Sequence, residues 1–126
     1  MVFEHFALNV NNVEEVVFWY CKHLELEVVS EQKEYPFMTF LADSTGRVVM
    51  ELYHRTDEII IDYTKQHHLT FHVAFVSENA KKDMDRLLKV GATYVEEVNK
   101  EDGSHLIMLR DPWGMPLQLC QRAHKF

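Results

Sequence analysis

The stretch HFALNV, residues 5–10, has a near copy in HVAFVS, residues 72–77. Each begins with histidine and then alternates its side chains, which is typical of a strand that is buried on one face. This duplication predicts a domain built from two similar halves.

The rest of the chain carries the same repeat. The interval from Glu51 to Gln118 equals the interval from His5 to His72. The interval between the turn sequences DSTG, residues 43–46, and DPWG, residues 111–114, is one residue longer than that interval. We expect this one-residue difference to lie inside the turns, where it leaves the flanking strands unaffected.

Each half is predicted to run strand, helix, then three strands. Asn12 with Glu15 predicts a helix start, Ser77 or Asn79 predicts another, and Gly91 suits a left-handed helix end. The predicted fold is therefore α+β in a single domain, residues 1–126, whose parts are module one (1–54), a link (55–68) and module two (69–126). Residues 59–61 are expected to form a short strand or a buried turn.

Composition excludes several classes of partner. The 126 residues carry a formal net charge of −7, and their 13 Lys and Arg are scattered, which argues against nucleic-acid binding. No apolar run approaches the roughly 18 residues of a membrane span. The first residues lack the pattern of a signal peptide, and two cysteines make no disulfide framework. We expect free thiols and a cytoplasmic location.

Strand alternation places four polar side chains on the face turned away from the helices: His5, Glu51, His72 and Gln118. A single histidine on a strand is usually a satisfied polar residue, but a carboxylate among apolar neighbours needs a partner or a metal. Two imidazoles and a carboxylate suit Zn, Ni, Co, Mn or Fe(II), and Gln118 would add an amide oxygen. The remaining histidines are expected on the surface or in loops: His23, His54, His67, His68, His105 and His124.

The segments FEHFALNV, VVMELYH, HLTFHVAFV and RDPWGMPLQLCQ resemble those of the vicinal oxygen chelate superfamily. That group includes glyoxalase I, methylmalonyl-CoA epimerase, extradiol dioxygenases and bleomycin-binding proteins. The resemblance implies two βαβββ modules that form a curved eight-stranded sheet around a metal cleft. It also implies a homodimer, a small-molecule substrate, and the metal ligands His5, Glu51, His72 and Gln118.

One position departs from the glyoxalase pattern. The last strand of the second module normally supplies a glutamate that binds metal and takes the substrate proton, whereas this chain has Gln118. Neutral glutamine cannot accept a proton near pH 7. The equivalent place in the first module holds Glu51, which is therefore the predicted ligand and base.

Three functions remain open. The first is a glyoxalase I-like lyase or isomerase that uses Zn, Ni, Co or Mn, abstracts a proton beside a carbonyl and stabilises an enediolate. The second is metal-independent binding of a small molecule, as in antibiotic resistance proteins. The third is an Fe(II) dioxygenase, which Gln118 disfavours because that family takes its carboxylate from the last strand.

The predicted substrate-binding residues are aromatic. Tyr53, Phe3 and Phe37 are expected in the cavity beside Glu51, and Trp113 either shields one rim or packs within its own turn. Arg110 either meets a substrate carboxylate or is a surface charge, and the second interpretation is favoured.

Overall fold

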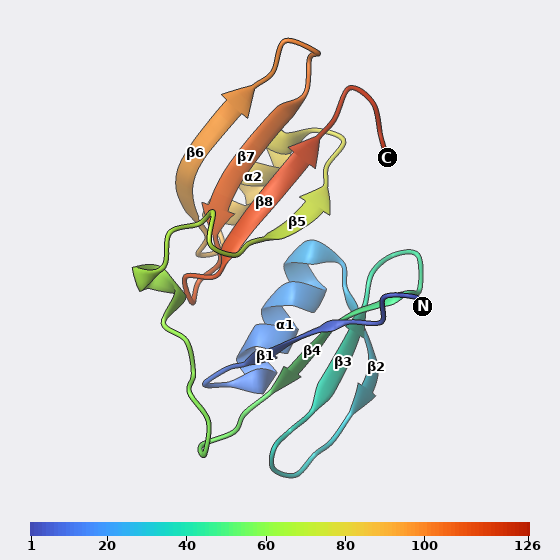
Figure 1. Cartoon of the computed structure of the whole chain (residues 1–126), viewed down its shortest axis with the longest axis vertical. Coiled ribbons are helices and arrows are strands. Elements are labelled where there is room, and N and C mark those ends of the chain that lie inside the picture. Colours follow the sequence, from blue (N-terminus) through green and yellow to red (C-terminus); the bar gives the residue numbers. More distant parts are fainter. The chain divides into compact units, whose positions relative to one another are not determined.

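The computed structural model describes all 126 residues, which divide into two compact units, Met1–Ile61 and Asp62–Phe126. Each unit contains one α-helix and one four-stranded sheet (Figure 1). The eight predicted strands are thus present as two sheets of four, one in each βαβββ module. The predicted α+β fold is confirmed, and the boundary between the units lies in the predicted link.

In the first unit, the strand order of the sheet is β1-β4-β3-β2, with β1 parallel to β4 and the other pairs antiparallel. The elements are β1 (Phe6–Asn9), α1 (Val13–Leu24), β2 (Glu27–Glu31), β3 (Thr39–Ala42) and β4 (Val48–Tyr53).

The second unit has the same topology, with strand order β5-β8-β7-β6 and β5 parallel to β8. The elements are the short 3-10 helix η1 (Tyr63–Lys65), β5 (Val73–Val76), α2 (Ala80–Leu88), β6 (Thr93–Asn99), β7 (His105–Arg110) and β8 (Pro116–Gln121).

Side-chain caps start both helices. Asn12 accepts a hydrogen bond from the Glu15 backbone N–H at 3.2 Å, and Asn79 accepts one from Lys82 N–H at 2.9 Å. Each bond satisfies one of the amides that a helix start leaves without a partner. The predicted cap at Asn12 is confirmed, and of the two alternatives for the second helix the structure has Asn79.

Each sheet has one face packed against the helix of its own unit. α1 packs against β2, β3 and β4, and α2 packs against β6, β7 and β8 (Figure 1). The strand residues that point toward the helices have no exposed surface: Leu41, Met50 and Leu52 in the first unit, and Ile107, Leu109 and Leu117 in the second. Because strand side chains alternate, the residues between these project from the opposite face.

Strand register shows the duplication directly. Ala7 is paired with Glu51 between β1 and β4, and Ala74 is paired with Gln118 between β5 and β8. The interval from Ala7 to Ala74 equals the interval from Glu51 to Gln118, as the sequence repeat predicts.

The one-residue difference between the two halves does not lie in the turns, so the expectation that the turns absorb it is wrong. Each turn closes with the same span, through backbone bonds from Asp43 N–H to Arg47 and from Asp111 N–H to Met115. The extra residue is Val49, which β3 skips when its pairing with β4 shifts register. A β-bulge absorbs one added residue without reversing the faces of the strand that follows it.

Other expectations at the edges of the strands also change. His5 and His72 each lie just before a strand rather than within it. Residues 59–61 form neither a strand nor a buried turn, and Ile59 is 83% exposed. No helix has the length and apolar character that crossing a membrane requires.

Candidate functional site

The first pair of predicted ligands comes together in the first unit. His5 Nε2 lies 3.2 Å from Glu51 Oε2, on the sheet face opposite α1. The side chains are 24% and 12% exposed, so both are largely shielded from water. The pairing of Ala7 with Glu51 explains the contact, because it brings the segment before β1 alongside the middle of β4.

The surroundings hold the His5 ring in place. The ring packs edge-on against Phe40 at a centroid distance of 5.3 Å. Phe40 is the β3 partner of Glu51, so both side chains share one face with the imidazole. Nδ1 of His5 is buried without a well-oriented hydrogen bond, although Glu4 Oε2 lies 2.9 Å away. A carboxylate thus faces each ring nitrogen, Glu4 at Nδ1 and Glu51 at Nε2.

The second pair belongs to the second unit. His72 Nδ1 lies 3.3 Å from the backbone oxygen of His68. A carbonyl oxygen only accepts, so Nδ1 carries the proton and the lone pair of a neutral imidazole lies on Nε2. Gln118 is half-buried on β8, and its Oε1 accepts a contact from Cys120 Sγ at 3.2 Å.

The His5–Glu51 spacing fits two ligands of a single cation. Atoms bound about 2.1 Å from a tetrahedral Zn²⁺ lie roughly 3.4 Å from each other, close to the observed 3.2 Å. No group of three or more His, Cys, Asp or Glu side chains within either unit is arranged to hold a metal ion. Each unit therefore offers two of the four predicted ligands, one imidazole with one carboxylate or carboxamide.

His68 lies in a loop, which is one of the two places expected for it, but it is not at the surface. It is only 7% exposed, and its Nε2 lies 2.7 Å from Glu96 Oε1 of β6. Its ring stacks on His67 at 4.2 Å. The sequence signal that was available is the HH pair close before His72, but no periodicity connects it to Glu96.

Arg110 is neither a surface charge nor free to bind substrate. Its guanidinium donates to the backbone oxygens of Tyr63 (2.7 Å), Gly114 (2.8 Å) and Gln66 (2.7 Å). These bonds tie η1 and the residue after it to the DPWG turn. These bonds give Arg110 a structural role that neither sequence-based interpretation included.

The four predicted substrate-binding aromatics do not form one group. Tyr53 lies two residues beyond Glu51 on β4 and shares its face. Phe3 is 61% exposed in the segment before β1, and its carbonyl accepts a bond from Arg47. Trp113 lies in a turn of the second unit, where its backbone N–H donates to Asp111.

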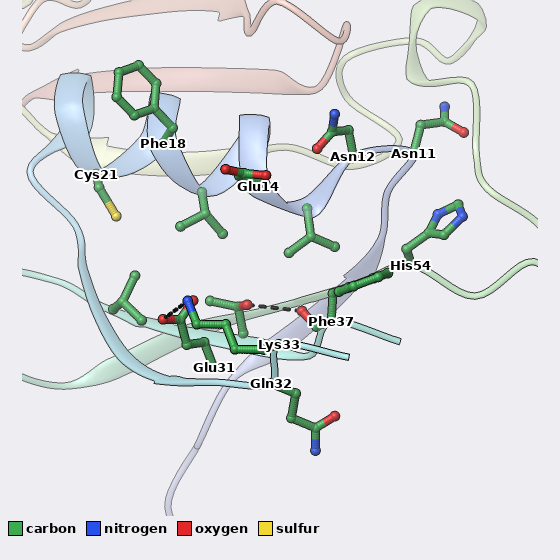
Figure 2. Close-up of a pocket in the computed structure, with 14 residues that line it drawn as sticks. Asn11, Asn12, Glu14, Phe18, Cys21, Glu31, Gln32, Lys33, Phe37 and His54 are labelled. Atoms are coloured by element: carbon green, nitrogen blue, oxygen red, sulfur yellow. Dashed lines mark hydrogen bonds and ion pairs between the residues drawn. The ribbon is translucent and has the colours of Figure 1, made fainter. Parts of the chain in front are cut away.

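Phe37 lines a different pocket, of about 640 Å³, between α1 and the β2–β3 part of the first sheet (Figure 2). Its apolar wall includes Val17 and Val28, and His54 stands at one end. His54 Nδ1 lies 2.8 Å from the carbonyl of Val10, which fixes the ring. The volume is that of a small-molecule site. However, the pocket lies on the helix side of the sheet, whereas Glu51 projects from the other side.

Both cysteines are free. Burial raises the pKa of the Cys21 thiol, with a smaller contribution from Glu27, and burial also raises the pKa of Cys120. A raised pKa keeps a thiol protonated and weakly nucleophilic. Neither residue therefore has the environment of a catalytic cysteine.

Comparison with known proteins places this geometry in a family. Residues 2–119 match the Glyoxalase/Bleomycin resistance protein/Dioxygenase superfamily, and the chain belongs to it. No curated protein matches significantly.

Solved structures share the fold at low sequence identity. A glyoxalase family protein from Bacillus cereus superimposes with a TM-score of 0.75 at 16% identity, covering 94% of this chain and 91% of that one. An antibiotic binding protein from Streptomyces sp. CB03234 gives 0.71 at 15% identity, covering 95% and 94%. A lactoylglutathione lyase from Agrobacterium tumefaciens gives 0.65 at 15% identity, covering 94% and 92%. At such identities the likeness establishes the fold alone.

Proposed function

We propose that this chain is a metal-dependent lyase or isomerase that removes a proton beside the carbonyl of a small substrate. His5, Glu51, His72 and Gln118 would bind one divalent cation, Zn, Ni, Co or Mn. The ligands would come from one chain or from two copies in a homodimer. The observation that supports this most is the 3.2 Å approach of His5 Nε2 to Glu51 Oε2 on a shielded sheet face.

Each residue of the proposed site has its own role. Glu51 accepts the substrate proton, because it is the one carboxylate among the four and Gln118 remains neutral near pH 7. The imidazoles of His5 and His72 would hold the cation, and the amide oxygen of Gln118 would complete the set. When bound, a divalent cation polarises the substrate carbonyl as a Lewis acid. Tyr53, two residues along β4, shares the sheet face of Glu51 and would contact a substrate bound there.

The runner-up is binding of a small molecule without chemistry. Two observations favour it: Gln118 provides no charge, and no group of three His, Cys, Asp or Glu side chains is arranged to hold a metal ion. The fold shared with an antibiotic binding protein is compatible with this interpretation. The Fe(II) dioxygenase interpretation gains no support, because the carboxylate it requires in the last strand is absent.

The experiment compares two substitutions on protein purified without chelator. Metal content is measured first, followed by turnover of the methylglyoxal–glutathione hemithioacetal as a model substrate. Glu51→Gln should lower turnover by about 100-fold or more, as expected for loss of a general base, whereas Gln118→Glu preserves or raises it. Glu27→Gln, on exposed β2, is the matched control and should have no effect.

Three results would separate the candidates. Equal activity of Glu51→Gln and Gln118→Glu removes Glu51 from the mechanism. Protein that takes up none of Ni, Zn, Co and Mn refutes the metal-dependent function. A ligand-dependent rise in melting temperature without any metal would then favour the binding protein.

A further inference from the structure

The orientation of His72 depends on a residue that the proposed function does not use. The His72 Nδ1–H donates to the backbone oxygen of His68, so the direction of the Nε2 lone pair follows from where that oxygen lies. Metal-binding histidines depend on such a partner for their tautomer and ring orientation.

His68 is itself fixed through its side chain. The ring is nearly buried, stacks on His67 and donates from Nε2 to Glu96 at 2.7 Å. A backbone oxygen in a connecting segment would otherwise move with that segment. The contact with β6 therefore anchors the oxygen that orients His72.

The register of the second sheet places this anchor on the site's face. Glu96 is paired with Met108, and Met108 is paired with Gln118, so all three project from the same side. The next residue, Glu97, projects from the other side and pairs with His105 at 2.5 Å. The sheet thus carries two His–Glu pairs of the same chemistry, only one of which leads to His72.

We propose that Glu96 and His68 are positioning residues for His72: Glu96 holds the His68 ring, and the His68 carbonyl keeps His72 in its Nδ1–H tautomer with Nε2 free for the cation. The metal-binding part of this inference rests on the proposed function. The tautomer part concerns the metal-free protein and stands independently.

The test uses full-length protein and two readouts. Nitrogen-15 NMR of the histidine rings reports the His72 tautomer without metal, and calorimetric titration with Ni²⁺ or Zn²⁺ reports affinity. The variants are Glu96→Ala and His68→Phe, which remove the anchor, and Glu96→Gln, which keeps an acceptor for the His68 N–H. Glu97→Ala is the matched control, because it breaks the neighbouring His–Glu pair.

In wild type and Glu97→Ala we expect the Nδ1–H tautomer. In Glu96→Ala and His68→Phe we expect a mixture of tautomers and an affinity about 10-fold or more lower, with Glu96→Gln close to wild type. The inference is overturned if the anchor variants match Glu97→Ala in tautomer and affinity. Wild-type protein with the expected tautomer but no metal binding would overturn the proposed function and the metal-affinity part, while leaving the anchor intact. Circular dichroism excludes unfolding as the cause.

Discussion

Replacing Arg110 by methionine tests whether this side chain is a structural tie or a substrate contact. Methionine keeps most of the apolar stem but removes all three donors to Tyr63, Gly114 and Gln66. The change therefore leaves the Gly114 carbonyl in a partly buried place without its donor. The Tyr63 oxygen keeps the backbone N–H of Gln66, and the exposed Gln66 oxygen regains water.

The expected cost follows from the lost bonds to a charged donor and from the Gly114 carbonyl that is left unsatisfied. A hydrogen bond to a charged group contributes about 1.5–3 kcal/mol net, and an unsatisfied buried acceptor costs about 1–3 kcal/mol. Both bonds come from one nitrogen, Nη1, so their contributions are not additive. We expect the free energy of unfolding to fall by roughly 2–4 kcal/mol.

Urea titration followed by circular dichroism measures this loss. Arg110→Lys should lower the free energy of unfolding by less, because an ammonium group keeps part of the hydrogen bonding of the guanidinium. Arg86→Met is the control, since its ion pair with Asp83 is exposed and such pairs contribute about 0.2–1 kcal/mol. A loss below about 0.5 kcal/mol for Arg110→Met, together with impaired turnover, would refute the structural role and restore the substrate contact.

Three further predictions concern turns and thiols. Gly114→Ala should destabilise the protein more than Gly46→Ala, because both glycines have positive φ but only at Gly114 would the new Cβ clash with Thr64. Thermal melts should separate the stabilities of the two variants by about 1–3 kcal/mol, and equal losses of stability would contradict the contact. Hydrogen bonds from Thr45, in the same turn, hold the pKa of Asp43 below its usual 3.8. The charged carboxylate therefore contributes stability above the unfolded pKa, and this is lost as pH falls through the folded pKa. The stability gap between wild type and Asp43→Asn should shrink below about pH 4, and a constant gap in acid titrations would contradict this. Burial raises the pKa of both cysteines. Alkylation by iodoacetamide at about pH 7.5 should therefore be several-fold slower in native than in unfolded protein. Equal alkylation rates, measured by mass spectrometry, would contradict this prediction.

The fold could be predicted because its evidence is periodic. Alternation in HFALNV and HVAFVS, and the equal intervals from His5 to His72 and from Glu51 to Gln118, mark two copies of one unit. The structure keeps that interval in both parallel strand pairs. The bulge at Val49 was missed, because an extra residue looks the same in a sequence whether a turn or a strand absorbs it.

The site could be predicted only in part. Strand alternation placed Glu51 on the face opposite the helix, and the register brings His5 to it. The roles of Arg110 and His68 depend on hydrogen bonds to distant backbone or strand residues, which no local pattern encodes. Phe37 was assigned to the wrong side of the sheet, because it lies in the connection before β3, where alternation gives no information.

The central claim is that one divalent cation binds between two imidazoles, Glu51 and Gln118. Anomalous diffraction from crystals grown with Ni²⁺ or Zn²⁺ tests it directly. We predict one strong peak about 2.0–2.2 Å from His5 Nε2 and Glu51, with His72 and Gln118 as the remaining ligands. The absence of a peak there, or a peak bound by other residues, would contradict it.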